Sequence, residues 1–113
     1  PTALIPALVQ SGLPCERFVF EGFLPPKKGR VSRLESLATE PKTVVLYESP
    51  HKLLKLFDQM IPFFGAARSV AVVRELSKLY ESTFRGTLAE AHIFFSEHKP
   101  KGEFVIVVEG FKN

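Results

Sequence analysis

The stretch that decides the fold is Thr43–Pro50, which reads Thr-Val-Val-Leu-Tyr-Glu-Ser-Pro. Its first five residues, Thr43–Tyr47, form a continuous β-branched and apolar run, which is typical of a strand covered on both faces. Glu48 ends the run, and we expect Ser49 to be the N-cap of a helix with Pro50 at its first position. A buried strand that passes into a helix in this way predicts an α/β protein.

The same alternation of strands and helices extends in both directions from this stretch. We predict further strands at Arg17–Phe23, Ser69–Arg74, Tyr80–Arg85 and Glu103–Val108. We predict helices over residues 3–11, at Val31–Thr39, from Pro50 to an end marked by Pro62 and Gly65, and after a capping box at Thr87–Glu90. This order indicates an α/β fold in which helices sandwich a mixed β-sheet.

The composition is that of one globular domain. The chain has 113 residues, of which 45% are hydrophobic and 24% charged, unlike the composition of disordered chains. Its longest apolar run, Phe104–Val108, is far shorter than the ~20 residues that a membrane-spanning helix needs. A single cysteine, Cys15, and three histidines provide neither an internal disulfide nor a zinc-binding spacing. We therefore expect a single domain over residues 1–113, located in the cytoplasm, with no membrane association and no metal.

The positive charge is concentrated in one loop. The formal net charge is +3, from 15 basic and 12 acidic residues. Lys27, Lys28, Arg30 and Arg33 contribute +4, so the remaining 11 basic and 12 acidic residues give −1. Such a loop either contacts a polyanion or is a solvated turn, and the residues alone leave both interpretations open.

Polar side chains follow two of the predicted strands, at Tyr47–His51 and Arg74–Lys78, and lie at the start of a third, at Lys101–Glu103. Ligands of open α/β sheets bind beyond the carboxyl ends of the strands, where helix N-termini present free N–H groups. The same residue types also suit caps, salt bridges and turns, so either role stays open. The sequence has no glycine-rich phosphate loop, nucleophile elbow or Cys/His pair, which leaves no basis for a kinase, a hydrolase or a metalloenzyme.

Five motifs, taken in order, resemble the C-terminal half of the ribosomal RNA small subunit methyltransferase I family, within the tetrapyrrole (corrin/porphyrin) methylase superfamily. They lie at Phe20–Arg30, Tyr47–Leu53, Arg74–Leu79, Arg85–Leu88 and Lys101–Val105. The resemblance implies a two-domain α/β protein that binds S-adenosyl-methionine between its domains and forms a homodimer. The implied activity is 2′-O-methylation of a cytidine ribose in small-subunit (16S) ribosomal RNA, with the RNA or the assembled small subunit as partner.

Carried over to the matching positions, the resemblance implies two groups of site residues. The cofactor side would be lined by Tyr47, Glu48, Ser49, Glu75, Gly102, Glu103 and Phe104. The RNA side would include Glu21, Lys27, Lys28, Arg30 and Arg33, with Lys78 and Arg85 as further contacts. The resemblance therefore favours an RNA contact over a solvated turn for the basic loop. It assigns no proton acceptor, for which Glu21, Glu48 and Glu75 all stay open.

The resemblance also implies that residues 1–113 are one part of the enzyme. In the family, the N-terminal half carries glycine-rich cofactor contacts, and Pro1-Thr2-Ala3 resembles the end of the turn that links the two halves. We therefore expect that this chain alone neither binds the cofactor tightly nor methylates RNA. Two other functions stay open: methylation of a corrin or porphyrin ring, and a non-enzymatic RNA-binding or dimerisation module.

Overall fold

The computed structural model describes residues 4–77 and 80–113 and confirms the predicted α/β class. Its helices are α1 (Leu4–Ser11), α2 (Arg30–Ala38), α3 (Leu53–Phe64) and α4 (Leu88–Glu97). Its strands are β1 (Phe18–Phe23), β2 (Thr43–Glu48), β3 (Ser69–Ser77), β4 (Tyr80–Thr87) and β5 (Glu103–Val108). Within the described ranges, no helix has the length and apolar character needed to cross a membrane.

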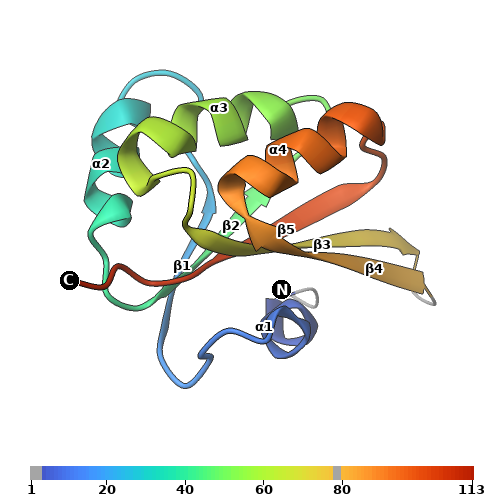
Figure 1. Cartoon of the computed structure of the whole chain (residues 1–113), viewed down its shortest axis with the longest axis horizontal. Coiled ribbons are helices and arrows are strands. Elements are labelled where there is room, and N and C mark those ends of the chain that lie inside the picture. The colour runs from blue at the N-terminus through green and yellow to red at the C-terminus, as the bar shows by residue number, and fades with distance from the viewer. Residues whose placement is uncertain (1–3, 78–79) are drawn as a thin grey trace.

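The five strands form one mixed sheet in the order β1-β2-β5-β3-β4. β1 runs parallel to β2, whereas the pairs β2–β5, β5–β3 and β3–β4 are antiparallel. Helices α2, α3 and α4 lie on one face of the sheet and α1 lies on the other (Figure 1). The predicted arrangement, a mixed sheet between helices, is therefore confirmed.

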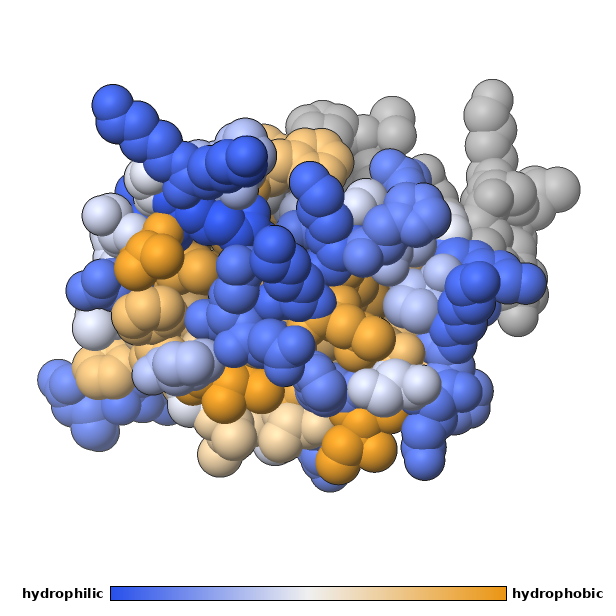
Figure 2. Space-filling view, turned by 90° about the horizontal axis from the view of Figure 1, so that it is seen from above, coloured by the Kyte–Doolittle hydropathy of each residue, from blue (hydrophilic) through white to orange (hydrophobic). Residues whose placement is uncertain are grey.

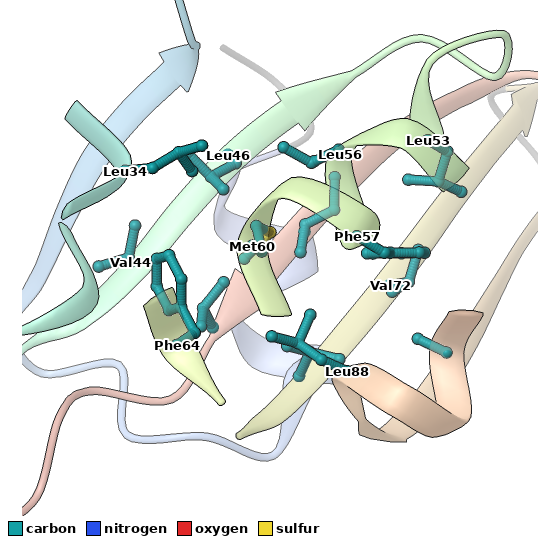
Figure 3. Packing of buried hydrophobic residues seen from close by; sticks show 14 of the residues in the cluster. Leu34, Val44, Leu46, Leu53, Leu56, Phe57, Met60, Phe64, Val72 and Leu88 are labelled. Atoms are coloured by element: carbon teal, nitrogen blue, oxygen red, sulfur yellow. The ribbon is translucent and has the colours of Figure 1, made fainter. Parts of the chain in front are cut away.

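The central strands are buried on both faces, as the apolar run at Thr43–Tyr47 predicted. Val44 and Leu46 pack under α2 and α3, together with Phe57 and Met60 (Figure 3). Val45 points to the opposite face and joins the cluster beneath α1. Burying side chains of this size contributes about 1.5–3 kcal/mol each, so these two clusters are what fixes the sheet between its helices. Seen from outside, the helical layer presents mainly hydrophilic residues with hydrophobic ones between them (Figure 2).

Two details of α3 differ from the prediction. The helix begins at Leu53 rather than Pro50, because residues 49–52 form a turn in which the Lys52 N–H donates to the Ser49 carbonyl at 3.2 Å. Ser49 is therefore not its N-cap. Pro62 lies inside the helix, whose last residue is Phe64 and whose C-cap is Gly65, so of the two residues predicted to mark the end only Gly65 does so. A proline inside a helix costs about 3 kcal/mol, and the burial of side chains from this helix, Phe64 among them, outweighs that cost.

The start of α4 matches the prediction closely. Thr87 is its N-cap: its hydroxyl accepts the Glu90 N–H at 3.1 Å, and the Glu90 carboxylate accepts the Thr87 N–H at 2.9 Å. This is the reciprocal capping box that the sequence predicted. Strand β5 also has the predicted bounds, while β3 and β4 each extend beyond theirs.

Candidate functional site

The three segments predicted to line a cofactor meet at one edge of the sheet. Phe104 of β5 lies opposite Glu48 of β2 on one side and opposite Arg74 of β3 on the other. Glu75 and Glu103 form the next pair of the same ladder. We call this row, from Glu48 through Phe104 to Arg74 with the pair Glu75–Glu103, the site edge.

The topology explains why these segments converge. β2 and β3 both end at the site edge and β5 starts there, because β5 is antiparallel to each of them. β1 is parallel to β2, so the loop that follows β1 leaves the sheet at this edge too. Gly102, just before β5, has a φ of 83°, a left-handed conformation that favours glycine. The sheet thus brings the predicted cofactor segments and the basic loop to one side of the molecule.

Glu48 holds the basic loop against the end of β2. Its carboxylate is buried, and it accepts the Ser49 N–H at 3.0 Å and lies 3.7 Å from the Arg30 guanidinium. Arg30 also donates to the Gln59 side chain at 2.8 Å and to the Pro25 carbonyl at 3.1 Å. One arginine therefore ties the loop to β2 and α3 at once. Its side chain is only 12% exposed, so Arg30 acts within the protein interior.

Arg33, one turn further along α2, pairs with Glu21 of β1. Its Nε and Nη2 atoms both donate to one carboxylate oxygen of Glu21, at 2.8 and 2.6 Å. The hydrogen bond to Glu21 raises the pKa of Arg33, partial burial opposes the shift, and the negative charge of Glu21 adds to it. Arg33 stays 43% exposed, so this pair lies at the surface.

Lys27 and Lys28 are the exposed cations of the loop. Within the described part of the chain, neither side chain forms an ion pair or hydrogen bond. The four basic residues, predicted to lie in one loop, therefore separate: Arg30 and Arg33 lie in α2 and pair with acids, whereas Lys27 and Lys28 lie in the loop before it and face solvent. Sequence reasoning did not anticipate this division, because nothing in the residue order shows which cation reaches the acid at the end of β2.

The other predicted site residues are less closely grouped. Lys78 lies outside the described residues, and Glu75 is placed by its backbone in the ladder. Arg85 is exposed on β4 opposite Ala71, three ladder positions from the site edge. Tyr47 packs against two phenylalanine rings of β1, with centroids 5.3 Å and 5.6 Å away.

Sequence reasoning also missed a cavity beside the site edge. It has a volume of about 370 Å³ and lies between β3, β4 and the end of α4. Its lining includes Arg74, Phe84, Phe94 and His98, and the His98 ring stacks on Phe94 with centroids 4.2 Å apart. The spacing of Phe94 and His98, one helical turn, was the available sequence signal.

The fold is that of a known class of proteins. The family model of the tetrapyrrole (corrin/porphyrin) methylases matches residues 1–92, and the chain belongs to this family. Among solved structures, the chain is similar in fold to cobalt precorrin-4 methyltransferase, a cobalamin biosynthetic enzyme (TM-score 0.62, 17% identity, 91% of this chain and 46% of that one). It is also similar in fold to the methyltransferase CobJ (TM-score 0.67, 16% identity, 92% of this chain and 46% of that one).

More similar in sequence are proteins named ribosomal RNA small subunit methyltransferase I. The protein of that name from Synechocystis is 51% identical over 96% of this chain and 39% of its own length. Those from Xylella fastidiosa and Thermotoga maritima are 46% and 41% identical, each over 97% of this chain, and over 41% and 49% of their own lengths. The chain thus spans less than half the length of these relatives.

Proposed function

We propose that this chain is one domain of an S-adenosyl-methionine-dependent methyltransferase that acts on small-subunit ribosomal RNA, at the 2′-oxygen of a cytidine ribose. The observation that carries the proposal is the site edge, where the ends of β2 and β3, the start of β5 and the basic loop come together. The names of the relatives support the RNA substrate, and the motifs that resemble this family support the position on the ribose.

The residues at the site edge fit one wall of a cofactor cleft. Phe104 is buried against Phe95 and fixes the start of β5, while Gly102 would let the main chain come close to a ligand. The Glu48 carboxylate already binds Arg30 and the Ser49 N–H, so we assign it the positioning of the loop. Main-chain groups of Tyr47–Ser49 and Gly102–Phe104 would then face the cofactor. When bound, S-adenosyl-methionine would supply the methyl group for the ribose 2′-oxygen and would leave as S-adenosyl-homocysteine.

The basic loop would hold the RNA acceptor by its phosphates. Lys27 and Lys28 are exposed ammonium groups beside the site edge, and each phosphate contact of this kind releases condensed counterions. Holding the acceptor in line with a bound methyl donor converts a bimolecular reaction into an effectively unimolecular one. The domain is expected to work in the cytoplasm as part of a homodimer, as the family resemblance implies, with the small ribosomal subunit as its partner.

Methyl transfer by the full-length protein tests this function. We would incubate it with small ribosomal subunits and labelled S-adenosyl-methionine and then map the labelled nucleotide. We expect label on one cytidine ribose, and lower transfer at moderate salt for the double variant Lys27→Ala/Lys28→Ala. The control is Lys42→Ala/Lys112→Ala, which removes two exposed lysines at the ends of β2 and β5 opposite the site edge and should transfer at the original rate. Label on a porphyrinoid with none on RNA would show instead a tetrapyrrole methylase.

A further inference from the structure

Two phenylalanine rings stand exposed on the edge strand β1. Phe20 is 44% exposed and Phe23 is 61% exposed, the latter among the most exposed large hydrophobic side chains described. Both rings meet Tyr47 edge-on, at interplanar angles of 71° and 76°. Tyr47 thus supports the two rings from the neighbouring strand.

A β-bulge places both rings on the same face of the sheet. Residues three apart in a regular strand point to opposite faces. Here Phe20 pairs with Val45 and Phe23 with Tyr47, two residues further along β2, so β1 contains one residue more than its partner between these positions. The shift occurs next to Gly22, whose φ of 70° favours glycine. The bulge therefore keeps Phe23 on the side of Phe20 instead of turning it toward α2.

Helix α1 covers a different part of this face. It packs against β3, β5 and β4, which lie in the half of the sheet farther from β1. The exposed rings lie next to the loop with Lys27 and Lys28, and four extended residues span at most about 14 Å from Phe23 to Lys27. Residues 22–34 contain no acid, and the nearby Glu21 and Glu48 are each paired with an arginine.

We propose that Phe20 and Phe23 form a stacking platform for unpaired bases of an RNA strand whose phosphates contact Lys27 and Lys28. This inference rests on the proposed function, since it names how the RNA substrate would be held. Exposed aromatic rings beside unpaired cations are the combination with which proteins bind single-stranded nucleic acids: bases stack on the rings and cations follow the backbone. An uncharged protein partner would cover the rings equally well but would leave the two lysines without a role.

Tryptophan fluorescence tests the stacking directly. The chain contains no tryptophan, so the Phe23→Trp variant has a single indole at the platform. We would titrate it with a single-stranded RNA of about ten nucleotides, a length within the usual range of such sites. We expect quenching as bases stack on the indole, and no quenching of the control Phe63→Trp, which replaces a 38% exposed ring on α3.

Affinity measurements separate stacking from charge. Phe20→Leu and Phe23→Leu keep an apolar side chain but remove the ring, and each should weaken binding about 5- to 100-fold at an unchanged salt slope. Lys27→Ala/Lys28→Ala should instead lower the slope of log K against log salt by about 1.4, or 0.7 for each phosphate contact with a single strand. Far-UV circular dichroism would confirm that each variant is folded.

Three outcomes would overturn the platform. These are the absence of RNA binding, quenching that is equal in the Phe63→Trp control, and self-association through the rings, seen as an indole emission that shifts with protein concentration without RNA. The methylation assay on the full-length protein is independent of these results. Transfer to RNA without quenching would overturn only the platform, and quenching without transfer would overturn only the enzymatic function.

Discussion

Replacing Arg30 by methionine should destabilise this domain more than any other single change in the basic loop. The substitution keeps an unbranched apolar stem and removes the guanidinium. Among the described residues, it leaves the Glu48 carboxylate, which is 7% exposed, with only the hydrogen bond from the Ser49 N–H, and it breaks the hydrogen bonds from Arg30 to Gln59 and Pro25.

The magnitude follows from the geometry. At 3.7 Å, opposite unit charges attract by about 4 kcal/mol at an effective dielectric constant of about 20. Desolvation of the two groups offsets roughly half of this, and two further hydrogen bonds contribute about 1 kcal/mol each. We therefore expect Arg30→Met to lower the free energy of unfolding by about 3–4 kcal/mol, which is a large part of the total for a domain of this size.

The assay is urea unfolding followed by far-UV circular dichroism, with Arg33→Met as the matched control. Arg33 lies on the same helix, but its pair with Glu21 is exposed, so its loss should cost about 0.5 kcal/mol. A double-mutant cycle with Glu48→Gln, which keeps an acceptor for the Ser49 N–H, should give a coupling of about 2 kcal/mol. Equal losses for Arg30→Met and Arg33→Met, with no coupling in the cycle, would refute the reasoning.

Three other predictions concern the rest of the domain. A β-carbon at Gly110 would overlap the Pro41 carbonyl, so Gly110→Ala should cost about 3 kcal/mol in urea unfolding, whereas Gly29→Ala, with open space around it, should cost about 1 kcal/mol; similar losses would disprove the overlap. Arg68 donates to two main-chain carbonyls, at 2.9 and 3.1 Å, and Arg68→Met should therefore lower the melting temperature by about 5–10 °C; an unchanged melting temperature would contradict this. Calorimetry with S-adenosyl-methionine should show only weak binding to the 113-residue chain, because in the proposed function the site edge supplies only one wall of the cofactor cleft, and a micromolar dissociation constant would contradict that proposal.

The sequence predicted best those features that depend on neighbouring residues alone. The continuous apolar run of β5 gave its bounds, and the Thr87–Glu90 capping box gave the start of α4, because both signals are local. The start of α3 was wrong because a turn at Ser49 and a helix cap at Ser49 use the same residue types. The bulge in β1 was missed because the alternation of side chains along a strand carries no information on the φ of Gly22.

The ion pairs of the site likewise could not be predicted from neighbouring residues. Motifs predicted which segments belong together, and the ladder positions of Glu48, Phe104 and Arg74 show them at one edge. The count of +4 in the loop, however, treats four cations as equivalent. Two acids that lie outside the loop, Glu21 and Glu48, pair with its arginines. No count along the chain could show this, because the pairs join residues from different elements of the fold.

This division of charge has a measurable consequence for RNA binding. If all four cations contacted phosphates of a single strand, they would contribute about 2.8 to the slope of log K against log salt, whereas the two lysines alone contribute about 1.4. Replacing Arg30 and replacing Lys27 should therefore have different effects. Loss of Arg30 should lower the free energy of unfolding and disturb the loop. Loss of Lys27 should leave the free energy of unfolding unchanged and lower the salt slope of RNA binding. A variant of Arg30 that kept full stability and lowered the slope by about 0.7 would show that its guanidinium leaves Glu48 to bind phosphate. The ion pair at the end of β2 would then be a contact that RNA replaces, and the loop would carry more of the binding than its two exposed lysines.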